Sequence, residues 1–121
     1  MEVGAFIRSR AGIEHPDIEM HFLPSVVIDH GQQLGHCHAF QAHVGPLRST
    51  SVGSVKLKSK DPREWPIIDP NYLSTAVDVE EFRQNVRLTR EVVAQKSFDK
   101  FRGKELLPTA QVQSDKEIDA F

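Results

Sequence analysis

The hexapeptide Ile18-Glu19-Met20-His21-Phe22-Leu23 decides how the first half of the chain is interpreted. Its first, third and fifth residues are large and apolar, and Pro24 interrupts the run. Because successive side chains of a strand point to opposite faces, this alternation predicts a strand with one face in the core. His21 belongs to the other face and is therefore expected to point away from the core.

Further strands are expected on both sides of this hexapeptide. Residues 3–7 form a short apolar run, and residues 36–44 and 52–58 alternate between apolar and polar side chains. Residues 29–35 contain two glycines and two glutamines and are expected to form a loop. The lysines along one side of residues 52–58 are typical of an antiparallel sheet that leaves one face in solvent.

The second half contains one long helix, which the spacing of apolar residues places at residues 78–95. Asp78 and Glu81 fit an N-cap and an acid at the third helical position. Together the elements predict an α+β fold, a mostly antiparallel sheet flanked by helices. The residues expected to pack between helix and sheet are Val79, Phe82, Val86 and Val93 of the helix with Met20, Phe22, Phe40 and Leu57 of the sheet.

Two shorter helical features are expected after the long helix. Phe98 and Phe101 are expected to anchor a helical turn that Gly103 closes. The run Ser114-Asp115-Lys116-Glu117 is a capping box and predicts a second helix. Because one helical turn is unstable without propagation, and the sequence stops at Phe121, we expect it to be part of a longer one.

Length and composition suit one globular domain over residues 1–121. Apolar residues make up 39% and the net charge is −2, which argues against a disordered chain and against a nucleic-acid-binding surface. No apolar run approaches the roughly 18 residues that span a bilayer, and no targeting segment is recognised. The single cysteine, Cys37, excludes an internal disulfide and is expected to be a small buried strand residue.

The chain has six histidines, which raises the question of a metal site. His36, His38 and His43 are the candidate ligands, since the first two share one face of a strand. No acidic or cysteine residue stands at a recognisable companion spacing, so we expect no metal.

Motifs for catalysis and nucleotide binding are not found in the sequence. His21 together with Asp29 and His30 could suggest acid–base chemistry, but neither a nucleophile motif nor paired carboxylates accompany them. The seven glycines form no GxGxxG or GxxxxGK[ST] pattern, so a dinucleotide is not expected to bind this chain.

Four segments, in this order and spacing, resemble the glucose-methanol-choline (GMC) oxidoreductase family. They are residues 3–9 (VGAFIRS), 16–22 (PDIEMHF), 53–59 (GSVKLKS) and 66–73 (PIIDPNYL). The runs at residues 101–106 (FRGKEL) and 113–118 (QSDKEI) resemble the choline-oxidising members in particular. The resemblance therefore covers nearly the whole chain.

The resemblance implies that the chain is part of the C-terminal, substrate-binding domain of an FAD-dependent enzyme that oxidises choline to betaine aldehyde. It implies that His21 lines the substrate pocket, and that the catalytic histidine lies in a His-Pro motif beyond Phe121. FAD, a flavin domain as partner and a mitochondrial location are then expected of the complete enzyme. The chain alone is expected to bind no FAD and to be inactive.

The residues leave two alternatives open. The first is a self-standing, non-catalytic binding module that kept the sheet and the helix and recognises a quaternary ammonium ligand or a protein partner. One Trp and one Tyr are little material for an aromatic cage around such a ligand. The second is a metal-binding protein that uses His36, His38 and His43.

Overall fold

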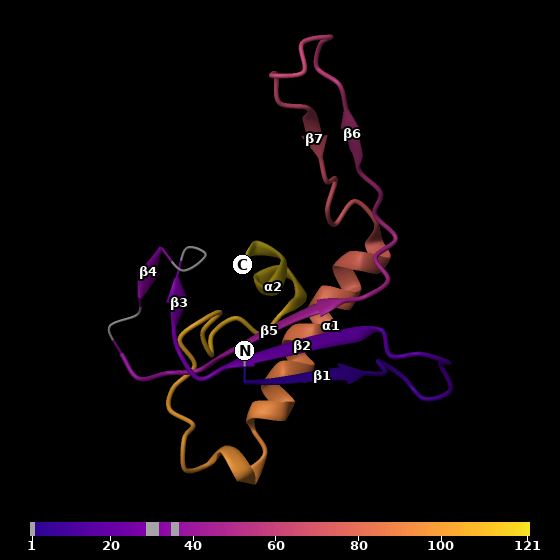
Figure 1. Ribbon diagram of the computed structural model, residues 1–121. Helices are drawn as coiled ribbons and strands as arrows, with labels where there is room; N and C mark the ends of the chain where they lie inside the picture. The colour runs from indigo at the N-terminus through magenta and orange to yellow at the C-terminus, as the bar shows by residue number, and fades with distance from the viewer. Residues whose placement is uncertain (1, 29–31, 35–36) are drawn as a thin grey trace.

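The computed structural model describes residues 2–28, 32–34 and 37–121 (Figure 1). A three-stranded antiparallel sheet, two minor strand pairs and two α-helices make up the fold. The elements in chain order are β1 (Val3–Ile7), β2 (Ile18–Leu23), β3 (Val27–Ile28), β4 (Gln33–Leu34), β5 (Gln41–Pro46), β6 (Ser54–Lys56), β7 (Ile67–Asp69), α1 (Ala76–Val93), the 3-10 turn η2 (Lys96–Phe98) and α2 (Asp115–Ala120). The α+β prediction is confirmed.

The main sheet has the order β1-β2-β5, with β2 in the centre. Met20 lies opposite Ala5 on one side and Val44 on the other, so the apolar residues of the three strands share a face. Ile18 and Met20 are only 5% and 7% exposed, which confirms the alternation predicted for β2. Helix α1 crosses this buried face (Figure 1).

The start of α1 differs from the prediction. Thr75 is the N-cap, and its side chain accepts a hydrogen bond from the amide of Asp78, which is the third helical residue. The Asp78 carboxylate is buried and accepts from the amides of Thr50 and Ser51 at 2.7 and 2.9 Å, and from the Thr50 hydroxyl at 2.8 Å. Asp78 therefore ties the helix to the segment after β5 instead of capping it.

The face of α1 that turns inward also differs from the predicted stripe. The fully buried residues are Asp78 and Asn85, whereas Phe82 is 40% exposed. Successive residues of an α-helix lie about 100° apart around its axis, so Val86 cannot point in the same direction as the buried Asn85. Val79, Val86 and Val93 are accordingly half-buried, because the polar Asp78 and Asn85 take the innermost positions.

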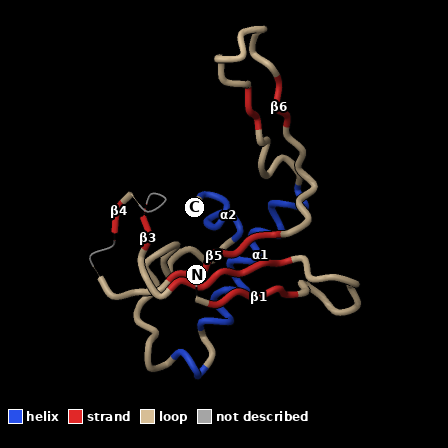
Figure 2. The backbone as a smooth tube through the Cα atoms, in the orientation of Figure 1, coloured by secondary structure: helices blue, strands red, loops and turns tan. Residues whose placement is uncertain are grey.

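Residues 53–70 form an arm that stands away from the main sheet, with β6 and β7 as its strands (Figure 2). Leu57, expected in the core, is 87% exposed, because nothing in the described chain packs over this two-stranded ribbon. Gly53 lies where the two ends of the arm come together, against the backbone of Asp69 and Pro70. A Cβ there would lie 2.2 Å from the backbone oxygen of Asp69, so only glycine allows this approach.

Three aromatic rings from distant segments pack together at one end of the sheet. Phe22, Phe40 and Phe98 have ring centroids 5.3 to 6.0 Å apart. This confirms Phe98 as an anchor of the turn, but Phe101 is exposed and Gly103 does not adopt a positive φ. The capping box at Ser114 is present as predicted and begins α2.

The structure corrects the predictions of a loop at residues 29–35, a strand at residues 36–44 and a buried Cys37. β5 begins at Gln41, later than predicted, so His38 and Phe40 precede it. Within the expected loop, β4 (Gln33–Leu34) is a short strand that pairs with β3. Cys37 is exposed instead of buried, because it lies before β5 and outside the sheet.

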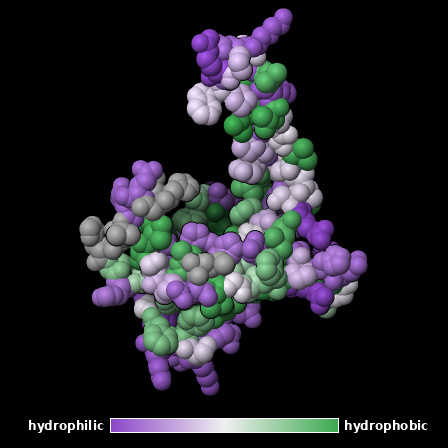
Figure 3. Space-filling view, viewed as in Figure 1, coloured by the Kyte–Doolittle hydropathy of each residue, from purple (hydrophilic) through white to green (hydrophobic). Residues whose placement is uncertain are grey.

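The chain leaves much of its surface uncovered. A compact protein of 13.7 kDa has about 6,600 Å² of accessible surface by the usual scaling, whereas this chain exposes 9719 Å². Hydrophobic surface is visible along the arm (Figure 3). The exposed apolar residues there are Val55, Leu57, Ile67 and Ile68. Such a surface is typical of a domain that packs against other protein.

Candidate functional site

The face of the main sheet opposite α1 carries the ionisable side chains of the three strands, together with Phe6 and two glycines. We call it the open face and define it by Phe6 of β1, Glu19 and His21 of β2, and His43 and Gly45 of β5. In the antiparallel register His21 lies directly between Gly4 and His43, and Glu19 lies between Phe6 and Gly45. The residues alternate with the buried Ile18 and Met20, so they point away from α1.

His21 and Glu19 are joined on this face by a short hydrogen bond. His21 Nε2 lies 2.7 Å from Glu19 Oε1, and the two side chains are 43% and 35% exposed. The contact follows from the strand, since residues two apart project from the same side about 6.7 Å from each other. His21 therefore lies where the sequence placed it, with a carboxylate partner that the sequence analysis did not assign.

The neighbours of this pair leave room above it. Gly45 lies beside Glu19, and a Cβ added to Gly45 would meet no atom within 4 Å. His43 is exposed, and cross-strand neighbours have Cβ atoms about 4.5–5.5 Å apart, so one small ligand can reach both imidazoles. An imidazole, a carboxylate and open space can bind a hydroxyl group and accept its hydrogen bond.

Sequence reasoning missed Glu19 and His43 as members of this site for different reasons. Glu19 was detectable, because residues i and i+2 of a strand share a face. His43 was not, because its position opposite His21 depends on the register of β5 across a long connection. Asp29 and His30, considered as partners of His21, lie outside the described residues.

The metal hypothesis finds no support in the described part of the chain. Within residues 2–28, 32–34 and 37–121, no three His, Cys, Asp or Glu side chains come together as metal ligands. His38 precedes β5 and His43 lies within it. His36 lies outside the described residues.

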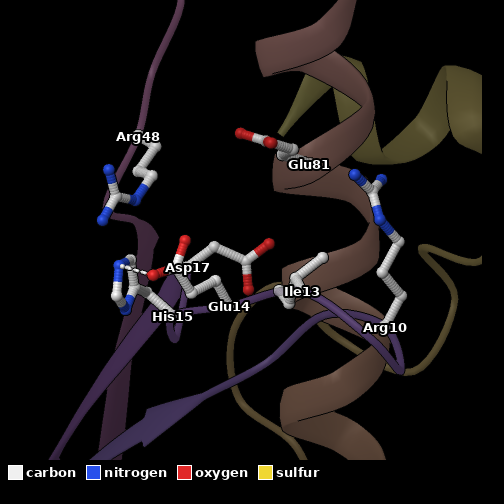
Figure 4. Close-up of a pocket in the computed structure, with 7 residues that line it drawn as sticks. All are labelled: Arg10, Ile13, Glu14, His15, Asp17, Arg48 and Glu81. Carbon is white, nitrogen blue, oxygen red and sulfur yellow. Dashed lines mark ion pairs between the residues drawn. The ribbon is translucent and has the colours of Figure 1, made fainter.

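A hollow lies between the β1–β2 loop, the segment after β5, and α1 (Figure 4). Its volume is about 310 Å³, and the lining residues are Arg10, Ile13, Glu14, His15, Asp17, Arg48 and Glu81. Burial raises the pKa of the Glu81 carboxyl, and the charges of Asp78 and Asp17 add to this effect. Glu81 Oε2 is buried without a hydrogen-bond partner among the described residues. No sequence pattern indicated this hollow.

The N-terminus of α1 does not fit a flavin pyrophosphate. Such a site needs free backbone amides and close approach through glycine. Thr75 already accepts from the amide of Asp78, and the Asp78 carboxylate places negative charge in the first turn. The residues Leu73-Ser74-Thr75 before the helix contain no glycine. A phosphate would therefore be repelled here.

Residues 49–121 match the family described as GMC oxidoreductase. The matched range is more than half of the chain and includes the arm, α1 and α2. The chain belongs to the GMC oxidoreductase family, as the sequence resemblance indicated.

Curated relatives match the chain over its whole length. It is 62% identical over 121 residues to a protein of Mus musculus called "Choline dehydrogenase, mitochondrial" and 59% identical to the Homo sapiens protein of that name. A Brucella suis protein called "Oxygen-dependent choline dehydrogenase" is 53% identical over 120 residues. The chain covers 20% of the first two relatives and 22% of the third, about a fifth of their length.

A solved structure shares the fold. Pyridoxine 4-oxidase from Mesorbium loti superposes with a TM-score of 0.83 at 25% sequence identity. The superposition covers 96% of this chain and 23% of that enzyme. Among the described residues, no helix is long and apolar enough to cross a membrane.

Proposed function

We propose that this chain is the substrate-binding part of an FAD-dependent choline dehydrogenase, and that His21 contacts the alcohol oxygen of the substrate. The observation that carries the proposal is the position of His21 on the open face of β2, half-exposed and directed away from α1. The buried face of the same sheet is filled by the helix, so only the open face is free to line a substrate cavity.

In this proposal the flavin is held by other parts of the enzyme. The relatives are about five times as long as the chain, and the start of α1 repels a phosphate. FAD supplies the acceptor for the hydride that leaves the alcohol carbon. His21 binds and orients the hydroxyl group, and a histidine outside this chain accepts its proton.

The arm is proposed as the surface that packs against the flavin domain. Its exposed side chains include Val55 and Ile68, which face each other across β6 and β7, together with Leu57 and Trp65. The whole chain exposes about 3,000 Å² more than a compact protein of its mass, and a permanent interface of the usual size could account for this excess. The names of the mouse and human relatives support a mitochondrial location for the complete enzyme.

The proposal is tested by replacing His21 with Ala in the complete enzyme. An unsatisfied hydrogen bond of about 1–3 kcal/mol predicts a loss of roughly 5- to 150-fold in kcat/KM for choline, with the flavin still bound. His15→Ala is the matched control, because His15 is exposed in the β1–β2 loop and away from the open face. Unchanged kinetics in His21→Ala would refute the assignment, and loss of flavin or of folding would make His21 structural.

A second measurement tests whether this chain holds the flavin by itself. The purified 121-residue chain is mixed with FAD and then freed of unbound flavin. We expect no flavin absorbance and no reduction of an electron-accepting dye when choline is added. A yellow protein, or dye reduction, would show that the chain holds the flavin itself.

A further inference from the structure

The two ring nitrogens of His21 have different surroundings. Nε2 is 2.7 Å from Glu19 Oε1, and this is the one hydrogen bond to the ring that the described residues make. An ionised carboxylate can only accept, so the hydrogen must be on Nε2. In the neutral imidazole one nitrogen is the donor and the other the acceptor, which leaves Nδ1 with its lone pair.

We propose that Glu19 is a positioning residue that holds His21 in the Nε2–H form, so that Nδ1 accepts the hydrogen bond of the substrate hydroxyl. This rests on the proposed function, because it specifies the atom through which His21 contacts the alcohol. The direction of the bond has a chemical consequence. An alcohol can donate a hydrogen bond to Nδ1, whereas the aldehyde product has no hydroxyl hydrogen and cannot.

The surroundings on the open face agree with this role for Glu19. On β1 the nearest neighbours of the pair are Gly4 and Phe6, neither of which has a polar side chain. On β5 the neighbours are Gly45 and His43, so His43 is the one other side chain of the three strands beside His21 that could share a proton with it. Glu19 is a half-buried residue of the central strand, which restricts the directions its carboxylate can take.

The tautomer is measured directly by long-range proton–nitrogen NMR on the chain labelled with 15N-histidine, at a pH where the ring is neutral. We expect an unprotonated Nδ1 and a protonated Nε2 for His21 in the wild type. Glu19→Gln keeps an accepting oxygen and should keep this pattern. Glu19→Ala should give averaged nitrogen shifts, and Glu19→Lys should reverse them, because an ammonium group donates to Nε2.

His43→Gln is the matched control and should leave the His21 pattern unchanged, because it removes the neighbouring imidazole and not the carboxylate. A wild-type His21 with its hydrogen on Nδ1 would overturn the proposal. So would a Glu19→Lys spectrum identical to that of the wild type in a chain that remains folded.

Kinetics of the complete enzyme test the consequence for the substrate. Glu19→Ala should raise KM for the alcohol about tenfold, the equivalent of one hydrogen bond, and Glu19→Gln should restore most of the loss. In the His21→Ala background, Glu19→Ala should have no further effect, since one residue acts through the other. Additive effects would contradict the positioning role. If His21→Ala itself is silent, the proposed function fails while the NMR result still decides the tautomer.

Discussion

The main sheet and the arm have similar alternation of apolar and polar residues, but the apolar residues are buried in the main sheet and exposed in the arm. β2 and β6 both alternate between apolar and polar residues, and both pair with an antiparallel neighbour. Met20 in β2 is 7% exposed, whereas Val55 in β6 is 71% exposed. The difference lies in what covers each strand pair, since α1 packs on the main sheet and nothing in the described chain packs on the arm.

This comparison separates two kinds of information in a sequence. Alternation specifies which side chains share a face, because that is a local property of a strand. It does not specify whether the chain supplies a second layer for that face. A two-stranded ribbon by itself is marginally stable in water, which is why we propose that the flavin domain supplies the layer that covers the arm.

The largest effect is expected from a core substitution in the main sheet. Met20→Ala should lower the free energy of unfolding by about 2–5 kcal/mol, because it removes a buried side chain and leaves a cavity under α1. Urea unfolding of the chain, followed by circular dichroism, measures the change. A loss below 1 kcal/mol would show that the main sheet is as weakly packed as the arm.

The next effect concerns the junction between the two regions. Asp78→Asn weakens three hydrogen bonds that fasten the segment leading to the arm onto α1. We expect the melting temperature to fall by roughly 5 °C, since charged acceptors make the stronger hydrogen bonds. Asp61→Asn is the matched control, because Asp61 pairs with Arg63 on the surface of the arm and should change little.

The same carboxylate predicts a dependence on pH. Hydrogen bonds from Ser51 and Thr50 hold the pKa of Asp78 well below its usual range. A lowered folded pKa gives stability that is present above the unfolded value of about 4 and is lost as the pH falls below it. Between pH 7 and pH 3 the wild type should therefore lose more stability than Asp78→Asn. Parallel curves for the two proteins would contradict the shift.

Asp78 also marks the limit of prediction from the sequence. The sequence places the helix within two residues, and the capping box at Ser114 is correct in detail, because both depend on neighbouring residues. Asp78 is misread as an N-cap because its true partners, Thr50 and Ser51, are 28 and 27 residues away. Asn85 takes an innermost position on α1 for which apolar spacing gives no signal.

The candidate site also has one part that local sequence predicts and one part that depends on distant residues. The direction of His21, away from the core, follows from alternation within β2 and is confirmed. The position of His43 beside it depends on the register between β2 and β5, which the sequence of β2 does not specify. The exposure of Leu57 has the same cause, since the sequence identifies an apolar face and cannot name what covers it.

A smaller effect is expected where a local signal acts alone. Ser114→Ala removes the N-cap of α2. The Ser114 hydroxyl accepts a hydrogen bond from the amide of Glu117. We expect a loss of about 1 kcal/mol, the usual value for an N-cap, and faster hydrogen exchange within α2. Ser97→Ala in the exposed turn η2 is the control, because no side-chain cap is formed there. Exchange that quickens throughout the main sheet would mean that α2 supports the whole fold.

The smallest effect on stability is expected in the arm. Leu57→Ser should change the free energy of unfolding by less than about 0.5 kcal/mol, because the side chain is 87% exposed and loses almost no packing. The same substitution should reduce association of the chain, measured by light scattering and by binding of a hydrophobic dye, since it removes an apolar side chain from the uncovered face. In the complete enzyme the outcome should reverse, and Leu57→Ser should destabilise, because the proposed flavin domain would bury this residue. A complete enzyme that tolerates Leu57→Ser as well as the isolated chain does would show that the arm remains uncovered, and the comparison between the two regions would then need another cause.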